Sequence, residues 1–376
     1  MKKTYLLNAC LSFYCLSLAF SLKASASPGF DLDVTGSAST AYDDNVTFVK
    51  EDKKSDNVTN LQIGLGAKQE GKTHTLALEG NLTQHLFSDN PSFNNNSQDI
   101  TIDFQKELSR YDRFSATNKF THAEDPQSFE DDFGRASGRY SYYRNIFNAG
   151  YTRDLSKHIS IQGHYGNESY SASREDVNDS LLHRVGFDVN YIKSSATAFL
   201  LGYDFATRHI DESGTATVHT LATGFRHFLT TQLYIDTRAG VSFVEAFDGG
   251  NAAEPSVIAA LTNDFNETDS ASLSYRKTST PSSFTADIFD SWRVALNLSR
   301  QLLERLKMTA SVFFGKGDFA AQNITDKQTG ASTRLSYEVT KNAQAFLAYT
   351  YSEVDSNIDT RGYDRNLVEV GVRVVF

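Results

Sequence analysis

The side chains that could do chemistry in this sequence are charged ones. They lie in segments where polar and apolar residues alternate, and they occupy the polar positions of those segments. The basic members closest to long polar loops are Lys119, Arg144, Arg184, Arg208, Arg276, Arg293, Arg334 and Arg365. Guanidinium and ammonium groups attract anions when they line a narrow passage with low-dielectric walls. We therefore predict a ring of basic side chains near one end of a passage, with a preference for anions.

Further charged residues occupy the same polar positions of the alternating segments, and so would lie on the same face as the basic residues. They are Asp31, Asp33, Glu107, Asp188, Asp204, Asp236, Arg238, Asp264 and Glu338, with Glu168 the one acid assigned to the height of the basic ring. Because unpaired charges in a dry core would be very costly, this face must be wet. Alternatively, the ring arginines pair with loop carboxylates and hold the loops, which contain Asp43, Asp44, Asp131, Asp132, Glu175 and Asp176.

Constellations typical of an enzyme or a metal site are weak in this sequence. The best hydrolase candidate is His85 with Ser88 and Asp89 nearby, and the nine histidines show no paired metal-ligand spacing. The two cysteines lie within the first 15 residues, which excludes a disulfide scaffold. We predict no catalytic residue, no metal site, no cofactor and no enzymatic activity. The net charge of −10 argues against nucleic acid as a partner.

The elements that must position these charges read as two-faced strands. From Phe30 to Tyr42, apolar or small residues alternate strictly with polar ones, which gives a strand one greasy face and one polar face. The same pattern recurs along the chain, for example over residues 233–243, 306–314 and 368–376. Apart from an apolar stretch at the N-terminus, no apolar run approaches the length of about 20 residues that a spanning helix needs.

Short turns alternate with longer polar loops between these segments, and together they separate about 18 strands. This arrangement predicts a single transmembrane, antiparallel, up-and-down β-barrel in the outer membrane of a Gram-negative bacterium. About 16 strands remain possible, because the segment from Val218 to Phe228 alternates poorly. A β-propeller would need four short strands per repeat, and a soluble sandwich would be unusually large.

The two ends of the chain resemble targeting signals. Lys2 and Lys3 precede an apolar stretch and the small residues Ala24-Ser25-Ala26, which predicts a cleaved signal peptide over residues 1–26. A membrane anchor is the alternative interpretation of this stretch. The barrel would then occupy residues 27–376, with no further domain. Phe376, at the end of an alternating strand, looks like the signal that outer-membrane barrel assembly machinery recognises.

The run Tyr42-Asp43-Asp44-Asn45-Val46 follows the first strand and precedes a polar loop. With the alternating last strand, it resembles the outer-membrane β-barrel porin family that is associated with exopolysaccharide and capsule operons. The resemblance implies an exit channel for a polysaccharide. It also implies a periplasmic polysaccharide-export protein as a partner, and outer-membrane lipids around the barrel. It implies no catalytic residue.

The sequence is therefore compatible with three functions. The first is export of an exopolysaccharide or capsular polysaccharide through a hydrated, polar lumen. The second is a general or substrate-specific diffusion porin for small solutes, which a long outer loop folded into the lumen would favour. Loop 124–140 is the longest candidate for such a loop. The third is a closed structural or adhesive barrel that acts through its outer loops.

Overall fold

The computed structural model describes residues 29–125, 133–134, 137–211, 213–282 and 284–376. The predicted signal peptide and the loop acids Asp131 and Asp132 lie outside the described residues. The strands are β1 (Phe30–Asp43), β2 (Asp56–Glu70), β3 (His74–Phe87), β4 (Asn95–Glu107), β5 (Asp112–Ala123), β6 (Tyr142–Asp154), β7 (Ile159–Ala172), β8 (Ser180–Ser194), β9 (Thr197–Ile210), β10 (Gly214–Phe228), β11 (Leu233–Glu245), β12 (Asn251–Asp264), β13 (Ser270–Pro281), β14 (Ile288–Leu303), β15 (Leu306–Phe319), β16 (Ile324–Thr340), β17 (Ala343–Ser356) and β18 (Tyr363–Val375). Two single-turn 3-10 helices, η1 (Pro91–Phe93) and η2 (Asp359–Arg361), lie in loops.

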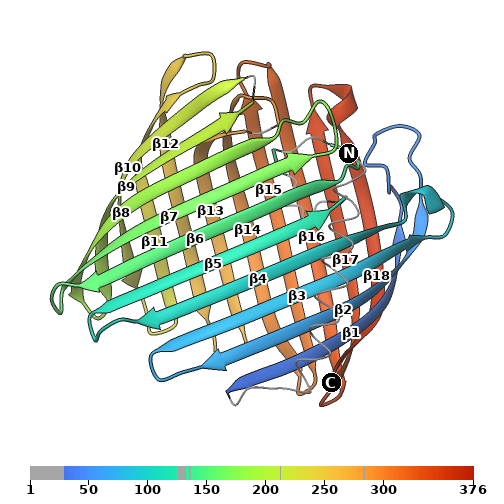
Figure 1. Ribbon diagram of the computed structural model, residues 1–376, viewed down its shortest axis with the longest axis horizontal. Helices are drawn as coiled ribbons and strands as arrows, with labels where there is room; N and C mark the ends of the chain where they lie inside the picture. The colour runs from blue at the N-terminus through green and yellow to red at the C-terminus, as the bar shows by residue number, and fades with distance from the viewer. Residues whose placement is uncertain (1–28, 126–132, 135–136, 212, 283) are drawn as a thin grey trace.

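Each strand pairs antiparallel with its neighbours in the chain, and β18 pairs back with β1, which closes an 18-stranded barrel (Figure 1). The prediction of an all-β, up-and-down barrel is confirmed. One end of the barrel carries short turns, such as residues 195–196, and the other carries long loops, such as residues 44–55. We call the loop-bearing end the outer end and the turn-bearing end the inner end, as in bacterial outer-membrane barrels.

The segment that alternates poorly is a complete strand, β10. Leu221 faces outward and is 55% exposed, whereas Val218 and Ala222 have the opposite parity and are only 5% and 3% exposed. The outward face also carries His219 and Thr223, and the inward face also carries Thr220, so apolar and polar residues mix on both faces and the alternation that identifies other strands is lost. The alternative of 16 strands is wrong.

The outward face of the barrel is apolar and exposed. Leu201, Phe243 and Val370, from β9, β11 and β18, are each more than half exposed. Such a surface suits contact with lipid chains, and the opposite parity holds the charged side chains of the interior. No helix among the described residues has the length and apolar character needed to cross a membrane.

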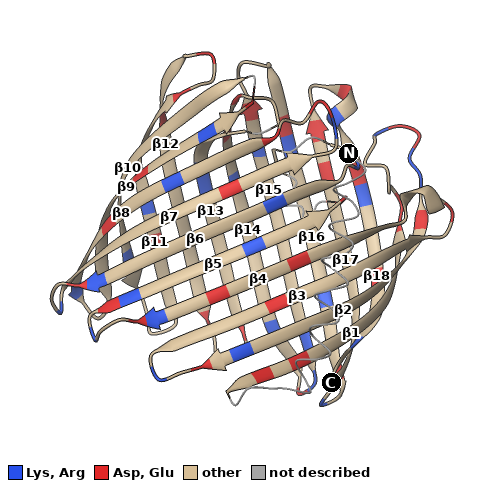
Figure 2. Cartoon of the chain, viewed as in Figure 1, with Lys and Arg blue, Asp and Glu red and all other residues tan. Residues whose placement is uncertain are grey.

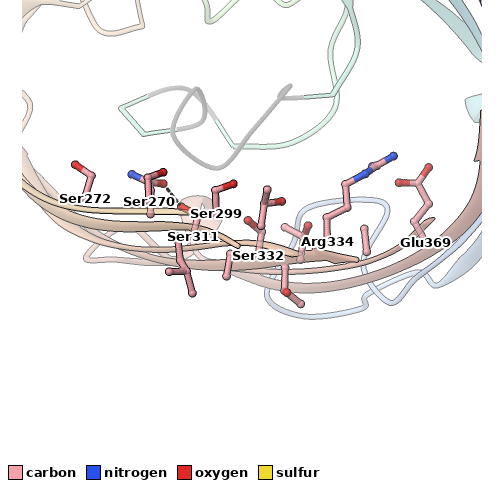
Figure 3. Close-up of a pocket in the computed structure, with 14 residues that line it drawn as sticks. Ser270, Ser272, Ser299, Ser311, Ser332, Arg334 and Glu369 are labelled. Carbon is pink, nitrogen blue, oxygen red and sulfur yellow. Dashed lines mark hydrogen bonds between the residues drawn. The ribbon is translucent and has the colours of Figure 1, made fainter. Parts of the chain in front are cut away.

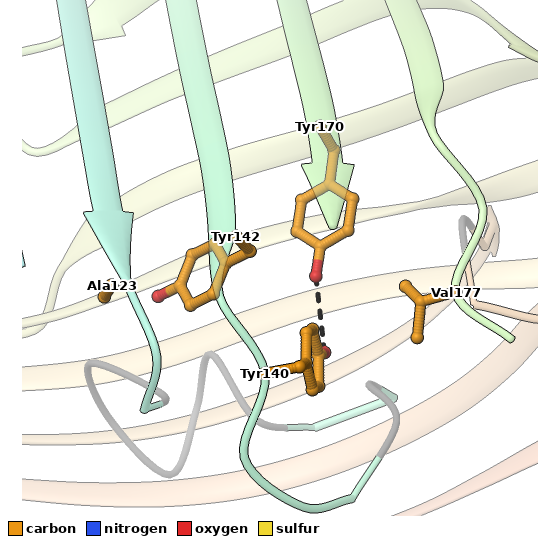
Figure 4. Close-up of a cluster of buried hydrophobic side chains, with 5 residues drawn as sticks. All are labelled: Ala123, Tyr140, Tyr142, Tyr170 and Val177. Carbon is orange, nitrogen blue, oxygen red and sulfur yellow. Dashed lines mark hydrogen bonds between the residues drawn. The ribbon is translucent and has the colours of Figure 1, made fainter. Parts of the chain in front are cut away.

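Buried hydrophobic clusters lie at the outer end, where loops fold over the strand ends. One cluster contains Val46, Val58 and Phe87, and a second contains Phe48, Val354 and Tyr363. The third contains Ala123, Tyr140, Tyr142, Tyr170 and Val177, in which the Tyr170 hydroxyl bonds the Tyr140 hydroxyl at 3.3 Å (Figure 4). The conventional hydrophobic core of this barrel is thus a layer beneath its outer loops.

Replacing Phe187 with Arg tests the assignment of the outward face. Phe187 is 48% exposed on β8, and an arginine facing the middle of the bilayer costs about 2–4 kcal/mol. We expect the free energy of unfolding in lipid vesicles to fall by that amount. The matched control is Asn190→Arg on the inward face of the same strand, which we expect to change it little. Equal losses for the two variants would contradict the assignment.

Candidate functional site

Charged residues lie along the strands between the two rims, as well as in the loops (Figure 2). In the middle of the strands, the charged residues alternate with the exposed apolar residues, so they face the interior of the barrel. Because a lipid-covered charge is expensive, this distribution is possible only if the interior is polar and hydrated. The inner wall of the barrel is therefore the candidate functional site.

A first cluster surrounds Glu168 near the outer ends of β6 to β9. Its carboxylate accepts hydrogen bonds from Arg144 Nη2 and from Arg208 Nη2, each at 2.7 Å. Arg208 also donates to Ser180 Oγ at 2.6 Å and is only 6% exposed. Charge-assisted bonds of this kind are strong. Two arginines of the predicted ring are thus held by the one acid that was predicted at their height.

A second cluster lies further toward the inner end, on β7, β8, β9 and β11. His164 Nε2 lies 2.8 Å from Asp204 Oδ1. Arg238 Nη2 donates to Asp204 Oδ2 at 2.5 Å and lies 3.3 Å from Asp188 Oδ1. The structure therefore brings together three predicted lumen charges. His164 was not singled out from the sequence, although it shares the inward parity of Glu168 on the same strand.

Two glycines make room for this second cluster. A Cβ atom at Gly186 would collide with the His164 ring and with Asp204. A Cβ atom at Gly202 would collide with Asp188 and Arg238. Because the intervening strands carry no side chain at these two points, ionic groups from non-adjacent strands can meet across them.

The predicted basic residues do not form one outer ring. Arg334 lies nearer to Thr340 than to Ile324, so it sits in the inner half of β16, and its placement in an outer ring is wrong. The height of a residue between the two ends of the barrel depends on the length and register of its strand. Spacing along the chain gave the wrong height for Arg334, because β16 is the longest strand. The Arg334 guanidinium stacks on the Phe346 ring at 3.7 Å.

The other members of the predicted ring lie nearer to the outer ends of their strands than to the inner ends. Arg276 and Arg293 oppose each other directly across β13 and β14. Arg184 on β8 and Lys119 on β5 are exposed to the lumen. Arg365 belongs to the junction of β1 and β18, as described below. The anion preference of these residues stays a prediction.

The remaining predicted lumen charges have the expected inward parity. Asp31, Asp33, Glu107, Asp264 and Glu338 lie near inner strand ends. Asp236 on β11 accepts a hydrogen bond at 2.6 Å from Arg226 of β10, which the sequence reading did not pair with it. The inner end of the wall therefore carries most of the predicted acids.

The best sequence candidate for catalysis does not assemble. The His85 ring nitrogens lie 2.8 Å from Asn60 Oδ1 and 2.9 Å from Ser97 Oγ, and neither contacts Ser88. The Ser88 hydroxyl instead donates to the Asn57 carbonyl at 2.9 Å. Among the described residues, no group of three His, Cys, Asp or Glu side chains is arranged to hold a metal ion.

The motif Tyr42-Asp43-Asp44-Asn45-Val46 closes the outer end of the seam between β1 and β18. Asp43 Oδ2 accepts a hydrogen bond at 2.6 Å from Arg365. Asp44 accepts two hydrogen bonds at 2.7 Å from the backbone and side chain of Asn366, and Asn45 Nδ2 donates to the Asp364 carbonyl at 2.8 Å. The family-like motif therefore has a structural role in this barrel.

A pocket of about 540 Å³ lies on the inner wall of β13 to β18 (Figure 3). Serine and threonine account for eight of the fourteen residues that line it, and they include Ser272, Ser299 and Ser311. Arg334 and Glu369 stand at one side of it. This wall presents neutral donors and acceptors, in contrast to the ionic wall of β6 to β11.

Phe133, in the connection between β5 and β6, lies inside the barrel. The Phe133 ring lies 5.0 Å from the ring of Phe289 on β14 and 5.4 Å from that of Phe313 on β15. These strands lie half-way round the ring from β5 and β6. Phe313 faces the lumen in the middle of its strand and is fully buried. Phe133 therefore lies against the wall opposite β5 and β6, a contact that the sequence did not predict.

Residues on either side of Phe133 are also fixed to the rim. Ser137 Oγ donates to the Arg361 carbonyl in η2 at 2.6 Å, and the Ser137 carbonyl accepts from Arg174 Nη1 at 2.5 Å. Arg139 forms ion pairs with Glu124 at 3.3 Å and with Asp125 at 2.8 Å. These contacts join loops from several strands into one layer across the outer mouth.

A family model described as "Putative beta-barrel porin 2" matches residues 289–376, which correspond to β14 through β18. No curated protein matches the chain. Solved structures with a similar fold include OccAB3 from Acinetobacter baumannii, with 10% identity over 92% of this chain and 99% of that chain and a TM-score of 0.47. OccK1 from Pseudomonas aeruginosa has 8% identity, the same coverages and a TM-score of 0.48.

The FrpB iron transporter from Neisseria meningitidis has 10% identity over 94% of this chain and 83% of that chain, with a TM-score of 0.48. Identities and TM-scores of this size establish no functional relationship. The family match supports the resemblance to a β-barrel porin family, although not its association with polysaccharide operons. The chain is a porin-like barrel of the Gram-negative outer membrane.

Replacing Arg365 with Ala tests the role of the seam contacts. Asp43 is 1% exposed, so this variant leaves a buried carboxylate without its cation. We expect the free energy of unfolding to fall by about 3–5 kcal/mol, measured by denaturant titration in lipid vesicles. Lys68→Ala breaks an exposed ion pair with Glu70 and serves as the control, with no measurable change expected. A stable Arg365→Ala variant would contradict a structural role for the motif.

Proposed function

We propose that this outer-membrane barrel is a channel for small hydroxylated solutes. The observation that carries the proposal is the contact of Phe133 with Phe289 and Phe313 on the opposite wall. An aromatic side chain held at this depth occupies part of the cross-section of the lumen. Barrels of 16–18 strands otherwise leave a wide aqueous passage, so this contact favours passage of small molecules over unhindered passage of a polymer.

The lining of the lumen supports hydroxylated solutes in particular. The pocket on β13 to β18 offers serine and threonine hydroxyls, which both donate and accept hydrogen bonds. A sugar or polyol that sheds part of its water there can exchange those bonds for bonds to the wall. The cost of desolvation is then offset without tight binding, which a channel needs for rapid release.

Export of an exopolysaccharide or capsular polysaccharide is the second candidate. The same hydroxyl-rich wall suits a sugar polymer, and the motif from Tyr42 to Val46 resembles the family associated with that role. A polymer would have to pass beside the segment that carries Phe133, or that segment would have to leave the wall. This requirement separates the two functions experimentally.

Swelling of proteoliposomes in neutral sugars of increasing size tests the proposal. We expect rapid entry of monosaccharides, slower entry of trisaccharides and almost none of a long dextran. The variant Phe133→Ser should speed the entry of the trisaccharide at least several-fold, because it removes the aromatic contact with the opposite wall. Phe265→Ser, at an exposed phenylalanine in an inner turn, should leave every rate unchanged.

Two results would count against the proposed function. Folded, inserted protein that admits no sugar would not be a channel for small solutes. Wild-type protein that admits dextran as fast as glucose would favour the polysaccharide conduit instead.

A further inference from the structure

We propose that Arg184, together with Arg208, forms a subsite for the carboxylate group of a passing solute. The proposal rests on the proposed function and adds a charge class to its substrates. Arg184 lies on β8 near the outer end, with inward parity and an exposed side chain. In the part of the chain that the structure describes, its guanidinium has no hydrogen-bond partner and no ion pair. Its donors are therefore available to a solute.

A second unused donor lies beside it. Arg208 is 6% exposed, and its Nε–H group is buried without a hydrogen-bond partner among the described residues. A buried donor without an acceptor is unfavourable, and such groups ordinarily have a protein, water or ligand partner. An anion held by Arg184 would supply the missing acceptor once the buried Arg208 Nε–H group turned toward it.

The backbone register leaves space around Arg184. Its neighbour across β7 is Gly166, and its neighbour across β9 is Ala206. Neither residue carries a side chain long enough to cover the guanidinium. A planar carboxylate could therefore approach the flat fork of Arg184, which matches the spacing of two carboxylate oxygens.

The charges around Arg184 favour a single negative charge. Arg144, Arg184 and Arg208 face one acid, Glu168, whose carboxylate already accepts bonds from the other two arginines, so this group carries two net positive charges. Toward the inner end, Asp204 and Asp188 share one cation, Arg238, so that cluster carries one net negative charge. One further negative charge therefore balances the two groups together. A monocarboxylate thus fits the local balance better than a phosphate dianion does.

The subsite and the hydroxyl-lined pocket lie on opposite sides of the barrel and at different heights. Arg184 is near the outer end of β8, whereas the pocket lies on β13 to β18 and includes Arg334 in the inner half of β16 (Figure 3). A small hydroxylated acid would meet them in succession along its path. The expected solute class is therefore a monocarboxylate that also carries hydroxyl groups, such as a sugar acid.

Equilibrium binding of gluconate tests this inference independently of transport. Gluconate is titrated into the purified, refolded full chain in detergent, and saturation-transfer NMR reports the dissociation constant. Glucose, which has the same hydroxyl pattern without the carboxylate, is the uncharged probe, and inorganic phosphate is the dianionic probe. We expect the wild-type protein to bind gluconate more tightly than either probe.

Variants then locate the site. Arg184→Gln should weaken gluconate binding about tenfold, because a charge-assisted pair of bonds is lost. Arg184→Lys should lose less, since it keeps the charge without the planar fork. Arg226→Gln removes the same charge near the inner end and should bind like the wild type. Heat-modifiable migration on gels verifies that each variant is folded.

Two results would overturn the inference. One is wild-type protein that prefers gluconate to neither glucose nor phosphate. The other is an Arg184→Gln variant with the same affinity as Arg226→Gln. Sugar entry in liposomes without Arg184-dependent gluconate binding would refute this subsite and leave the proposed channel intact. Arg184-dependent binding of gluconate without sugar entry would support this subsite and contradict the proposed channel.

Discussion

The constraint on which the rest of this structure depends is the pairing of backbone polar groups within a bilayer. No water is present in the hydrocarbon layer to satisfy an open strand edge, so the sheet must close on itself. Closure joins β1 to β18, where the ladder runs only from Thr35 to Asp43, although β1 pairs with β2 from Phe30. The side-chain contacts of Asp43 and Asp44 with β18 reinforce the outer end of this seam.

Closure also sorts the side chains into a lipid face and an interior with two different walls. On β6 to β11, ionic groups meet across strands, because Gly186 and Gly202 leave gaps for them. On β13 to β18, serine and threonine are the most frequent residues around the pocket. Phe133, which follows β5 in the chain, packs against Phe289 on the opposite side of the barrel. Selectivity in such an interior would come from weak successive contacts rather than from one tight site.

Much of the fold could be predicted from the sequence, because a strand with one lipid face alternates with a period of two. That rule located the strand faces and most of the inward charges, and it was weakest at β10, where polar and apolar residues mix on both faces. The pairing of Arg238 with Asp204 needs the register of three strands, which no local pattern reveals. The misplaced height of Arg334 has the same origin. The contact of Phe133 with Phe289 depends on closure of the whole ring.

The central claim is that the interior is a water-filled passage that stays conductive although loops meet across its outer mouth. Single-channel recording of the refolded wild-type protein in a planar bilayer tests it most directly. The account predicts stable, stepwise ionic currents whose reversal potential in a salt gradient reports the selectivity of the lining charges. Protein that is shown to be folded and inserted, yet carries no current, would contradict it.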